Sequence, residues 1–245
     1  MTTPHAMNQR HREKRLAALR YVLALPKSIW YNFRLLPFRQ ACHLPLLLSH
    51  RTRVVCCSGR LTLHADRLRI GLVKIGFNTY QQTHFRHDIT TLSLQGSMEV
   101  MGECAVGAGC SIQIGGKGVL TLGDKSLIGP KTLIICHRAI TFGRQNRISW
   151  CCTFMDSDQH RLIDENGNCC NEDRPILFDD YIWVGCHVIV SKGTHLPSYT
   201  TVGTGSVVHG THTESRTVLA GNPAHVVRRN VVREDFLKEE QRSKN

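Results

Sequence analysis

Aliphatic residues recur every six positions along much of the chain. A helix repeats about every 3.6 residues and a strand alternates about every two, so a sustained period of six fits neither. It predicts a solenoid in which each hexad forms one short strand and one corner, and three hexads complete a coil. The aliphatic side chain of each hexad then points inward, where stacked coils bury a continuous column. The longest run contains Phe178, Val184, Val190, Leu196, Val202 and Val208.

Shorter runs with the same spacing precede it. They contain Val100, Val106 and Ile112; then Leu122, Ile128, Ile134 and Ile140; and, after a slip of two residues, Phe142, Ile148 and Phe154. Glycine follows the aliphatic residue in several hexads, as a tight corner favours. The pattern resembles that of the hexapeptide-repeat proteins. This resemblance implies a mainly β fold, the left-handed parallel β-helix.

Polar sequence interrupts the period over residues 157–177, which we expect to form a loop extruded between two coils. We expect three parts in the chain: a basic arm over residues 1–53, the solenoid over residues 54–230, and a charged helix or tail over residues 231–245. The arm and the tail are candidates to cap the two ends of the solenoid, since a solenoid has exposed ends. The tail is predicted to be helical over residues 231–241.

The N-terminal arm carries most of the net charge. The chain has 31 Lys and Arg against 19 Asp and Glu, a formal charge of +12. Residues 1–53 contribute +9 of this, with ten basic residues and one acid, Glu13. No nucleic-acid-binding motif accompanies the charge, so we expect no specific nucleic acid partner.

Apolar residues alternate with basic ones inside the arm. Leu16, Leu19 and Leu23 fit one face of a helix. Pro26 is expected to end this helix, and Pro37 a second short one, because proline lacks the N–H that a helix interior uses.

Two roles stay open for residues 1–39. A basic amphipathic helix that bears tryptophan and phenylalanine, here Trp30 and Phe33, is typical of segments that lie on an anionic membrane. The other role is to cover the open end of the solenoid, with the basic side chains in water.

Eleven cysteines are present, and their spacing argues against disulfides and zinc. The count is odd, three pairs are adjacent in sequence, and no Cys-x-x-Cys occurs. We therefore expect free thiols, no bound metal and a reducing compartment. The first residues lack the continuous apolar segment of a signal peptide, so we expect a cytoplasmic protein.

The extruded loop carries the candidate chemistry. It begins with Asp156, Asp158 and His160 at the point where the period breaks. An imidazole can accept a proton from an attacking hydroxyl, and a neighbouring carboxylate can orient it. A solvated loop histidine with two loop acids is the alternative.

The order of motifs downstream resembles that of the hexapeptide-repeat acyltransferases, especially the sugar O-acetyltransferases. After the His160 loop come the segments YIWVG at 181–185, VIVSKGTHLPSYTTVGTGSVV at 188–208 and AGNPAHVVRR at 220–229. The resemblance covers about residues 120 to 229. It implies that His160 is the general base.

The same resemblance assigns a cofactor-binding set. Trp183 and Gly185 match positions along the pantetheine arm of acetyl-CoA, and Thr204 lines the same arm. Cys186 matches a small residue whose backbone N–H faces the thioester carbonyl, and Arg228 a basic residue near the nucleotide phosphates. The expected cofactor is acetyl-CoA, the acyl donor, and the expected assembly is a homotrimer with its sites between subunits.

The resulting functional hypothesis is an acetyl-CoA-dependent O-acetyltransferase that modifies a sugar hydroxyl, in the biosynthesis of surface polysaccharide. Residues 1–39 would hold the cytoplasmic enzyme at the inner membrane face. Two alternatives stay open: N-acetylation of an amino sugar or amino acid, and a non-catalytic β-helix that docks through its basic arm.

Overall fold

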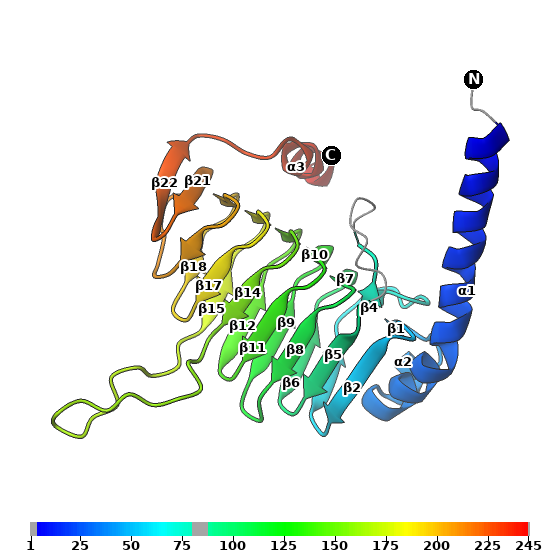
Figure 1. Ribbon diagram of the computed structural model, residues 1–245, viewed down its shortest axis with the longest axis horizontal. Helices are drawn as coiled ribbons and strands as arrows, with labels where there is room; N and C mark the ends of the chain where they lie inside the picture. The colour runs from blue at the N-terminus through cyan, green and yellow to red at the C-terminus, as the bar shows by residue number, and fades with distance from the viewer. Residues whose placement is uncertain (1–3, 80–87, 245) are drawn as a thin grey trace.

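The chain folds into a parallel β-helix flanked by helices, as its six-residue period predicts (Figure 1). The computed structural model describes residues 4–79 and 88–244. Residues 1–3 of the predicted arm, 80–87 of the first coils and 245 of the tail lie outside this description. Successive strands pass in turn to three walls, here called sheets A, B and C.

Within the described residues the strands of each wall pair in parallel with their counterparts one coil away, except for the last two strands of sheet A, which pair antiparallel. Sheet A contains β1 (Leu46–Leu48), β4 (Val73–Phe77), β7 (Cys104–Gly107), β10 (Ser126–Ile128), β13 (Arg147–Ile148), β16 (Trp183–Val184), β19 (Thr201–Val202), β21 (Thr217–Gly221) and β22 (Ala224–Arg229). Sheet B contains β2 (Thr52–Cys57), β5 (Thr90–Leu94), β8 (Ser111–Ile114), β11 (Leu133–Cys136), β14 (Thr153–Met155), β17 (Ile189–Ser191) and β20 (Val207–Val208). Sheet C contains β3 (Arg60–Leu63), β6 (Ser97–Val100), β9 (Val119–Leu122), β12 (Ala139–Phe142), β15 (Ile176–Phe178) and β18 (His195–Leu196).

The hexad aliphatics form the core. Every residue of the predicted inward column is buried, from Val100 to Val208. The slip of two residues has a simple cause: β12 turns both Ile140 and Phe142 inward, so that coil carries two inward positions on sheet C. Burial of these side chains is the main favourable term for the fold.

The solenoid begins earlier than the sequence indicates. Its first strand, β1, lies inside the segment assigned to the arm, and β2 begins at Thr52. The run of leucines in β1 is fully buried, but its short length and neighbouring prolines hid it from the six-residue pattern.

Helix α1 (Pro4–Leu35) covers the free edge of β1 (Figure 1). The Asn32 side chain donates to the Leu46 carbonyl at 2.7 Å and accepts from the Leu46 N–H at 3.1 Å. Ser28 Oγ accepts from the Leu48 N–H at 2.9 Å. These two buried side chains satisfy backbone groups of β1 that would otherwise need a neighbouring strand. Helix α1 therefore caps this end of the solenoid.

The expectation that Pro26 ends the first helix is wrong. Helix α1 continues through Pro26, and only Pro37 separates it from α2 (Phe38–Ala41). Val22, four residues before Pro26, lies on the exposed side of the helix, where water can replace the missing hydrogen bond. Packing of the following turns against β1 then keeps the helix continuous. Among the described residues, no helix is both long and apolar enough to span a bilayer.

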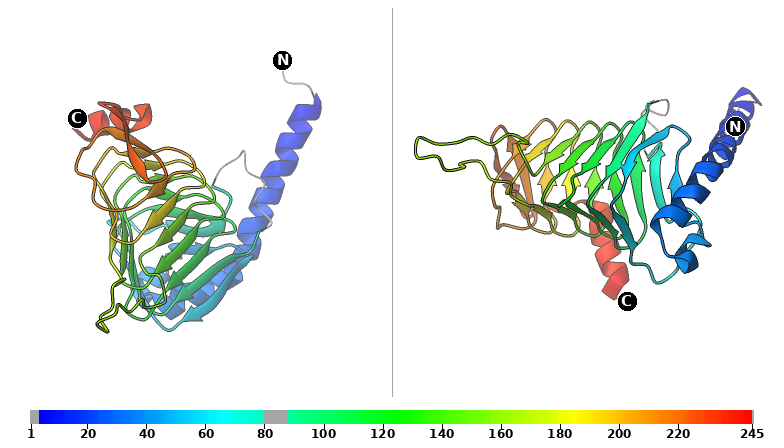
Figure 2. Two further views of the ribbon diagram at one scale, coloured as in Figure 1. Left: turned by 60° about the vertical axis from the view of Figure 1, so that its left-hand side comes forward. Right: turned by 90° about the horizontal axis from the view of Figure 1, so that it is seen from below.

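The other end of the chain leaves the coils through a hairpin that the sequence did not predict. Strands β21 and β22 pair antiparallel about a cis Asn222–Pro223 bond. Helix α3 (Glu234–Lys244) follows, three residues later than the predicted start, and lies along the outside of the solenoid (Figure 2).

Candidate active site

The extruded loop leaves the solenoid between β14 and β15, at the corner between sheets B and C, and projects from the body (Figure 1). Below this corner Phe142, Phe154 and Phe178 pack edge to face, with ring centroids 5.0 to 5.8 Å apart. Each such pair contributes about 0.5–1.5 kcal/mol beyond burial. The two ends of the loop are therefore anchored on a rigid aromatic cluster.

Asp156 holds the corner from inside. It is fully buried, and its two carboxylate oxygens accept hydrogen bonds from the backbone N–H groups of His137 and Arg138 at 2.7 and 2.8 Å. Its own carbonyl accepts from the Arg174 N–H at 3.1 Å, where the chain returns from the loop. Both oxygens thus face the backbone of the preceding coil, an arrangement suited to positioning the loop.

Asn171 and Lys192 close the neck of the loop. The Asn171 amide donates to the His160 carbonyl and to Asp158, each at 2.8 Å, and accepts from the Leu162 N–H. Lys192 donates to Asp158 and to the Asn171 carbonyl. The Lys192 ammonium and the Asn171 amide lower the pKa of Asp158 below its usual range.

His160 lies exposed on this neck. The Asn171 amide binds its backbone carbonyl, while its imidazole ring faces solvent. Gln159, directly before it, has a positive φ of 61°. In the described part of the chain the His160 imidazole has no hydrogen-bond partner, since Asp156 and Asp158 are engaged elsewhere. Its ring therefore remains available to a substrate hydroxyl.

A cavity of about 340 Å³ joins His160 to a second histidine, His137. His137 follows β11 at the same corner, and its ring lies against Gly115. Its Nε2 atom is buried and has no partner among the described residues. The sequence alone does not single out His137, because the register that brings it beside the loop arises only when the coils stack.

The predicted cofactor residues lie elsewhere, along sheet A and the corner between sheets A and B. Trp183 stands on the outer face of β16, 38% exposed. Cys186 and Thr204 occupy equivalent corner positions in successive coils, with Cys186 Sγ 3.6 Å from Thr204 Oγ1. Arg228 lies on β22, beyond these coils.

The corner between sheets A and B offers backbone donors. Among the described residues the N–H groups of Cys186 and Thr204 have no acceptor, while the Cys186 carbonyl accepts from the Gly205 N–H at 2.9 Å. Gly185 permits this close stacking, since a Cβ there would lie 2.7 Å from the Thr204 nitrogen. Backbone N–H groups without an acceptor can stabilise a developing oxyanion.

The side chains at the C-terminal end also suit this cofactor. Arg228 is exposed and has no ion-pair partner in the described part of the chain, unlike its neighbour Arg229, which pairs with Glu214. A free guanidinium matches a phosphate group. Arg233, between β22 and α3, lies 5.2 Å from the centroid of the Trp183 ring.

One chain therefore does not bring all the predicted site residues together. His160 shares a cavity with His137 at the corner between sheets B and C. Trp183 and Cys186 belong to sheet A and the next corner, on another side of the coil. The two groups can form one site only if a second copy of the chain supplies one of them.

Comparison with known proteins gives one sequence relative and several similar structures. No family model matches the chain. A Klebsiella pneumoniae protein, described as an uncharacterized 24.8 kDa protein in cps region, is 26% identical over 199 residues, covering 81% of this chain and 86% of the relative.

Two solved structures of similar fold are acyltransferases. The polySia specific acetyltransferase NeuO matches over 77% of each chain, with a TM-score of 0.54 and 19% identity. AntD, an N-acyltransferase from Bacillus cereus in complex with dTDP and coenzyme A, matches over 81% of this chain and 87% of its own, with a TM-score of 0.50 and 12% identity. At these identities the likeness shows a shared fold.

Proposed function

We propose that this chain, which has the fold of the hexapeptide-repeat acyltransferases, transfers the acetyl group of acetyl-CoA to a sugar hydroxyl. The observation that supports it most is that one chain carries both an imidazole with no hydrogen-bond partner among the described residues, His160, and a corner whose backbone N–H groups have no acceptor there, at Cys186 and Thr204. An acyl transfer to a hydroxyl needs a base, an oxyanion donor and a surface for the acyl donor. His160, the Cys186 N–H and Trp183 are the groups proposed for these three roles.

In this mechanism His160 accepts the proton of the sugar hydroxyl as the oxygen attacks the thioester carbonyl carbon. The Cys186 N–H stabilises the resulting oxyanion. When the C–S bond breaks, His160 returns the proton to the departing CoA thiolate, which leaves the acetyl ester and CoA. Asp156 and Asn171 act through the backbone, by fixing the loop that carries His160.

We further infer a homotrimer with its sites between subunits. In such a trimer His160 of one subunit faces Trp183 on sheet A of its neighbour. The two halves of the site, which are separate in a single chain, then meet at the interface. Closed cyclic symmetry makes all three sites equivalent.

The acceptor proposed is a sugar of a surface polysaccharide. The relative's position in a cps region supports a polysaccharide substrate, as does NeuO, which acts on polySia. An amino sugar as acceptor is the competing proposal, since AntD is an N-acyltransferase.

A coupled assay tests the transfer itself. Free CoA is measured after mixing the protein with acetyl-CoA and each member of a panel of neutral, acidic and amino sugars. Trp183→Ala should weaken acetyl-CoA binding by about tenfold in calorimetry, the factor that roughly 1.4 kcal/mol of lost contact represents. Absence of CoA release with every acceptor, together with no acetyl-CoA binding, contradicts the proposal.

We also propose that α1 holds the enzyme on the cytoplasmic face of the membrane. Its outer side is apolar although its inner side already caps the solenoid: Ile29, Trp30 and Phe33 are 43 to 68% exposed. Arg34, exposed in the last turn of the same helix, suits an anionic lipid surface.

Vesicle sedimentation distinguishes this role from capping. A variant with serine at Ile29, Trp30 and Phe33 should lose binding to phosphatidylglycerol vesicles yet stay folded, because these side chains lie outside the core. A variant with serine at the exposed Val55 and Ile70 of the solenoid is the matched control. Equal binding by both variants contradicts the membrane role.

A further inference from the structure

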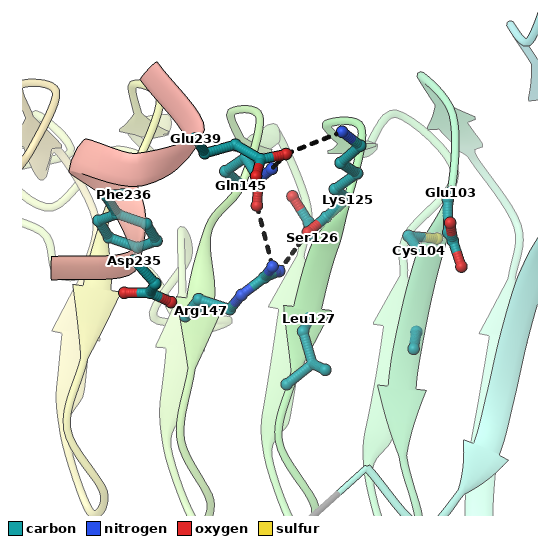
Figure 3. Close-up of a pocket in the computed structure, with 11 residues that line it drawn as sticks. Glu103, Cys104, Lys125, Ser126, Leu127, Gln145, Arg147, Asp235, Phe236 and Glu239 are labelled. Atoms are coloured by element: carbon teal, nitrogen blue, oxygen red, sulfur yellow. Dashed lines mark hydrogen bonds and ion pairs between the residues drawn. The ribbon is translucent and has the colours of Figure 1, made fainter. Parts of the chain in front are cut away.

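A cavity of about 540 Å³ lies beside α3 on the outer face of sheet A (Figure 3). Ala105, Leu127 and Arg147 line it, and the register of β7, β10 and β13 places these three side by side. The next position in the same row is Trp183, which pairs with Arg147. The cavity therefore continues the Trp183 row toward the N-terminal coils.

A carboxylate of the chain itself reaches into this cavity. Lys125 Nζ and Gln145 Nε2 both donate to Oε1 of Glu239, each at 3.1 Å. The Gln145 side chain accepts from Arg147 Nη2 at 2.9 Å, which leaves its amide N–H groups for the carboxylate. Arg147 also donates to the Lys125 carbonyl, so its guanidinium lies between Lys125 and Gln145 (Figure 3). Two donor side chains thus converge on one carboxylate, and Arg147 lines the same cavity beside them.

Attachment of α3 does not account for this convergence. The helix is anchored by Phe236, which is buried and packs edge to face on Tyr181 with centroids 5.7 Å apart. The Lys125 side chain is half exposed, and ion pairs at such sites add little to stability. Gln145, by contrast, is 5% exposed and held in place, as a residue of a binding site is.

We propose that Lys125, Gln145 and Arg147 form a binding site for the carboxylate of an acidic sugar acceptor, and that Glu239 occupies this site when no acceptor is bound. The proposal rests on the acetyl transfer proposed above and names its substrate class. A guanidinium, an ammonium and an amide together match the donor pattern that a carboxylate accepts. The cavity falls within the range of small-molecule sites, about 300–1,000 Å³.

Competition by Glu239 has a measurable consequence. Because the acceptor must displace the Glu239 carboxylate, removing that charge should strengthen acceptor binding, whereas removing a donor should weaken it. A merely structural role for Glu239 predicts the reverse or no change.

Calorimetry with N-acetylneuraminic acid and its methyl ester tests binding without any acetyl transfer. Glu239→Gln should bind the acid several-fold more tightly, and Lys125→Gln or Arg147→Gln about tenfold more weakly, a change of roughly 1.4 kcal/mol. The ester, which lacks the charge, should bind all variants alike. Glu234→Gln is the matched control, since Glu234 lies on the same helix, outside the cavity, and pairs with Lys238.

Kinetics then separate this proposal from the proposed function. In the acetyl-transfer assay the KM for the acid should follow the binding changes, while the KM for acetyl-CoA stays constant. Equal binding of acid and ester by the unmodified protein overturns the carboxylate site even if acetyl transfer occurs. Charge-dependent binding without transfer to any acceptor upholds the site and overturns the function. Lys125→Gln, on a half-exposed side chain, keeps the test valid if Arg147→Gln fails to fold.

Discussion

The two parts of the candidate site, the wall of the solenoid and the extruded loop, are held in place by different interactions. On the wall, the Trp183 N–H donates to the Thr200 carbonyl at 3.0 Å, and the Gly185 N–H to the Val202 carbonyl at 2.8 Å. Each position rests on the backbone of the next coil, over a column of buried aliphatics. At the neck of the loop, the contacts depend on a few side chains, chiefly Asp156 and Asn171.

Because the two parts are held differently, substitutions in them should have different consequences. A substitution on the wall removes a side chain and leaves the backbone ladder intact, so it should change ligand contacts alone. A substitution at the neck removes the bonds that position His160, so it should change geometry and chemistry together. The variants below use this contrast.

The largest effect is expected at the base. His160→Ala should lower turnover by about 10²–10⁴-fold, the usual contribution of a positioned general base, with acetyl-CoA affinity unchanged. Steady-state CoA release, paired with calorimetry, measures both. His64→Ala, an exposed histidine after β3, is the control. Full turnover by His160→Ala removes the base from the mechanism.

Mixed trimers sharpen the comparison between wall and loop. Co-expression of His160→Ala with Trp183→Ala should restore activity to about a quarter of the normal value, because random assembly gives roughly one interface in four with both residues intact. The assay uses acetyl-CoA well below its KM, where each variant alone should be defective, Trp183→Ala because it binds acetyl-CoA about tenfold more weakly. If the mixture is no more active than its components, His160 and Trp183 do not meet across an interface.

Asp156→Asn should destabilise the protein by about 1–3 kcal/mol, since one backbone N–H at the buried corner would then face an amide N–H₂ instead of an oxygen. Turnover should fall with it, as His160 loses its fixed position. Thermal unfolding measures the first effect, and Asp66→Asn, at an exposed site, is the control. Unchanged stability with lost turnover would instead assign Asp156 a direct catalytic role.

The smallest effect concerns pH at the neck. The pKa of Asp158 is lowered in the folded protein by Lys192 and Asn171, so its contribution is present above the ordinary aspartate pKa of about 3.9 and is lost as pH falls through the lowered value. Hydrogen exchange of the loop should therefore be slower than in Asp158→Asn at neutral pH, and the difference should vanish in acid. A difference that persists in strong acid would contradict this.

Much of the fold could be predicted from the chain alone. The six-residue period predicted the inward column of side chains. Aliphatic residues that recur every six positions can all be buried only if the chain forms stacked coils. The polar break located the extruded loop, and Pro37 the end of α1. Cys110 and Cys152 lie in the core, where burial raises the pKa of each thiol to about 12.

Other features depended on contacts between distant segments. Pro26 lies inside a helix because Ser28 and Asn32 form hydrogen bonds with the edge of β1. Local sequence rules do not include the free energy of these tertiary contacts. The sequence suggests Asp156 as a carboxylate that could orient His160. Stacking of the coils instead directs this carboxylate toward the preceding coil.

The sequence by itself therefore determined the scaffold and supplied the candidate site residues, since both depend on local spacing and residue type. Only the tertiary structure decided which of these residues face one another. The corners of a solenoid lie on different sides of each coil, so His160 and Trp183, close in sequence, are far apart in one chain. Glu239 lies 114 residues from Lys125 and 94 from Gln145, yet α3 folds back to bring its carboxylate to both side chains.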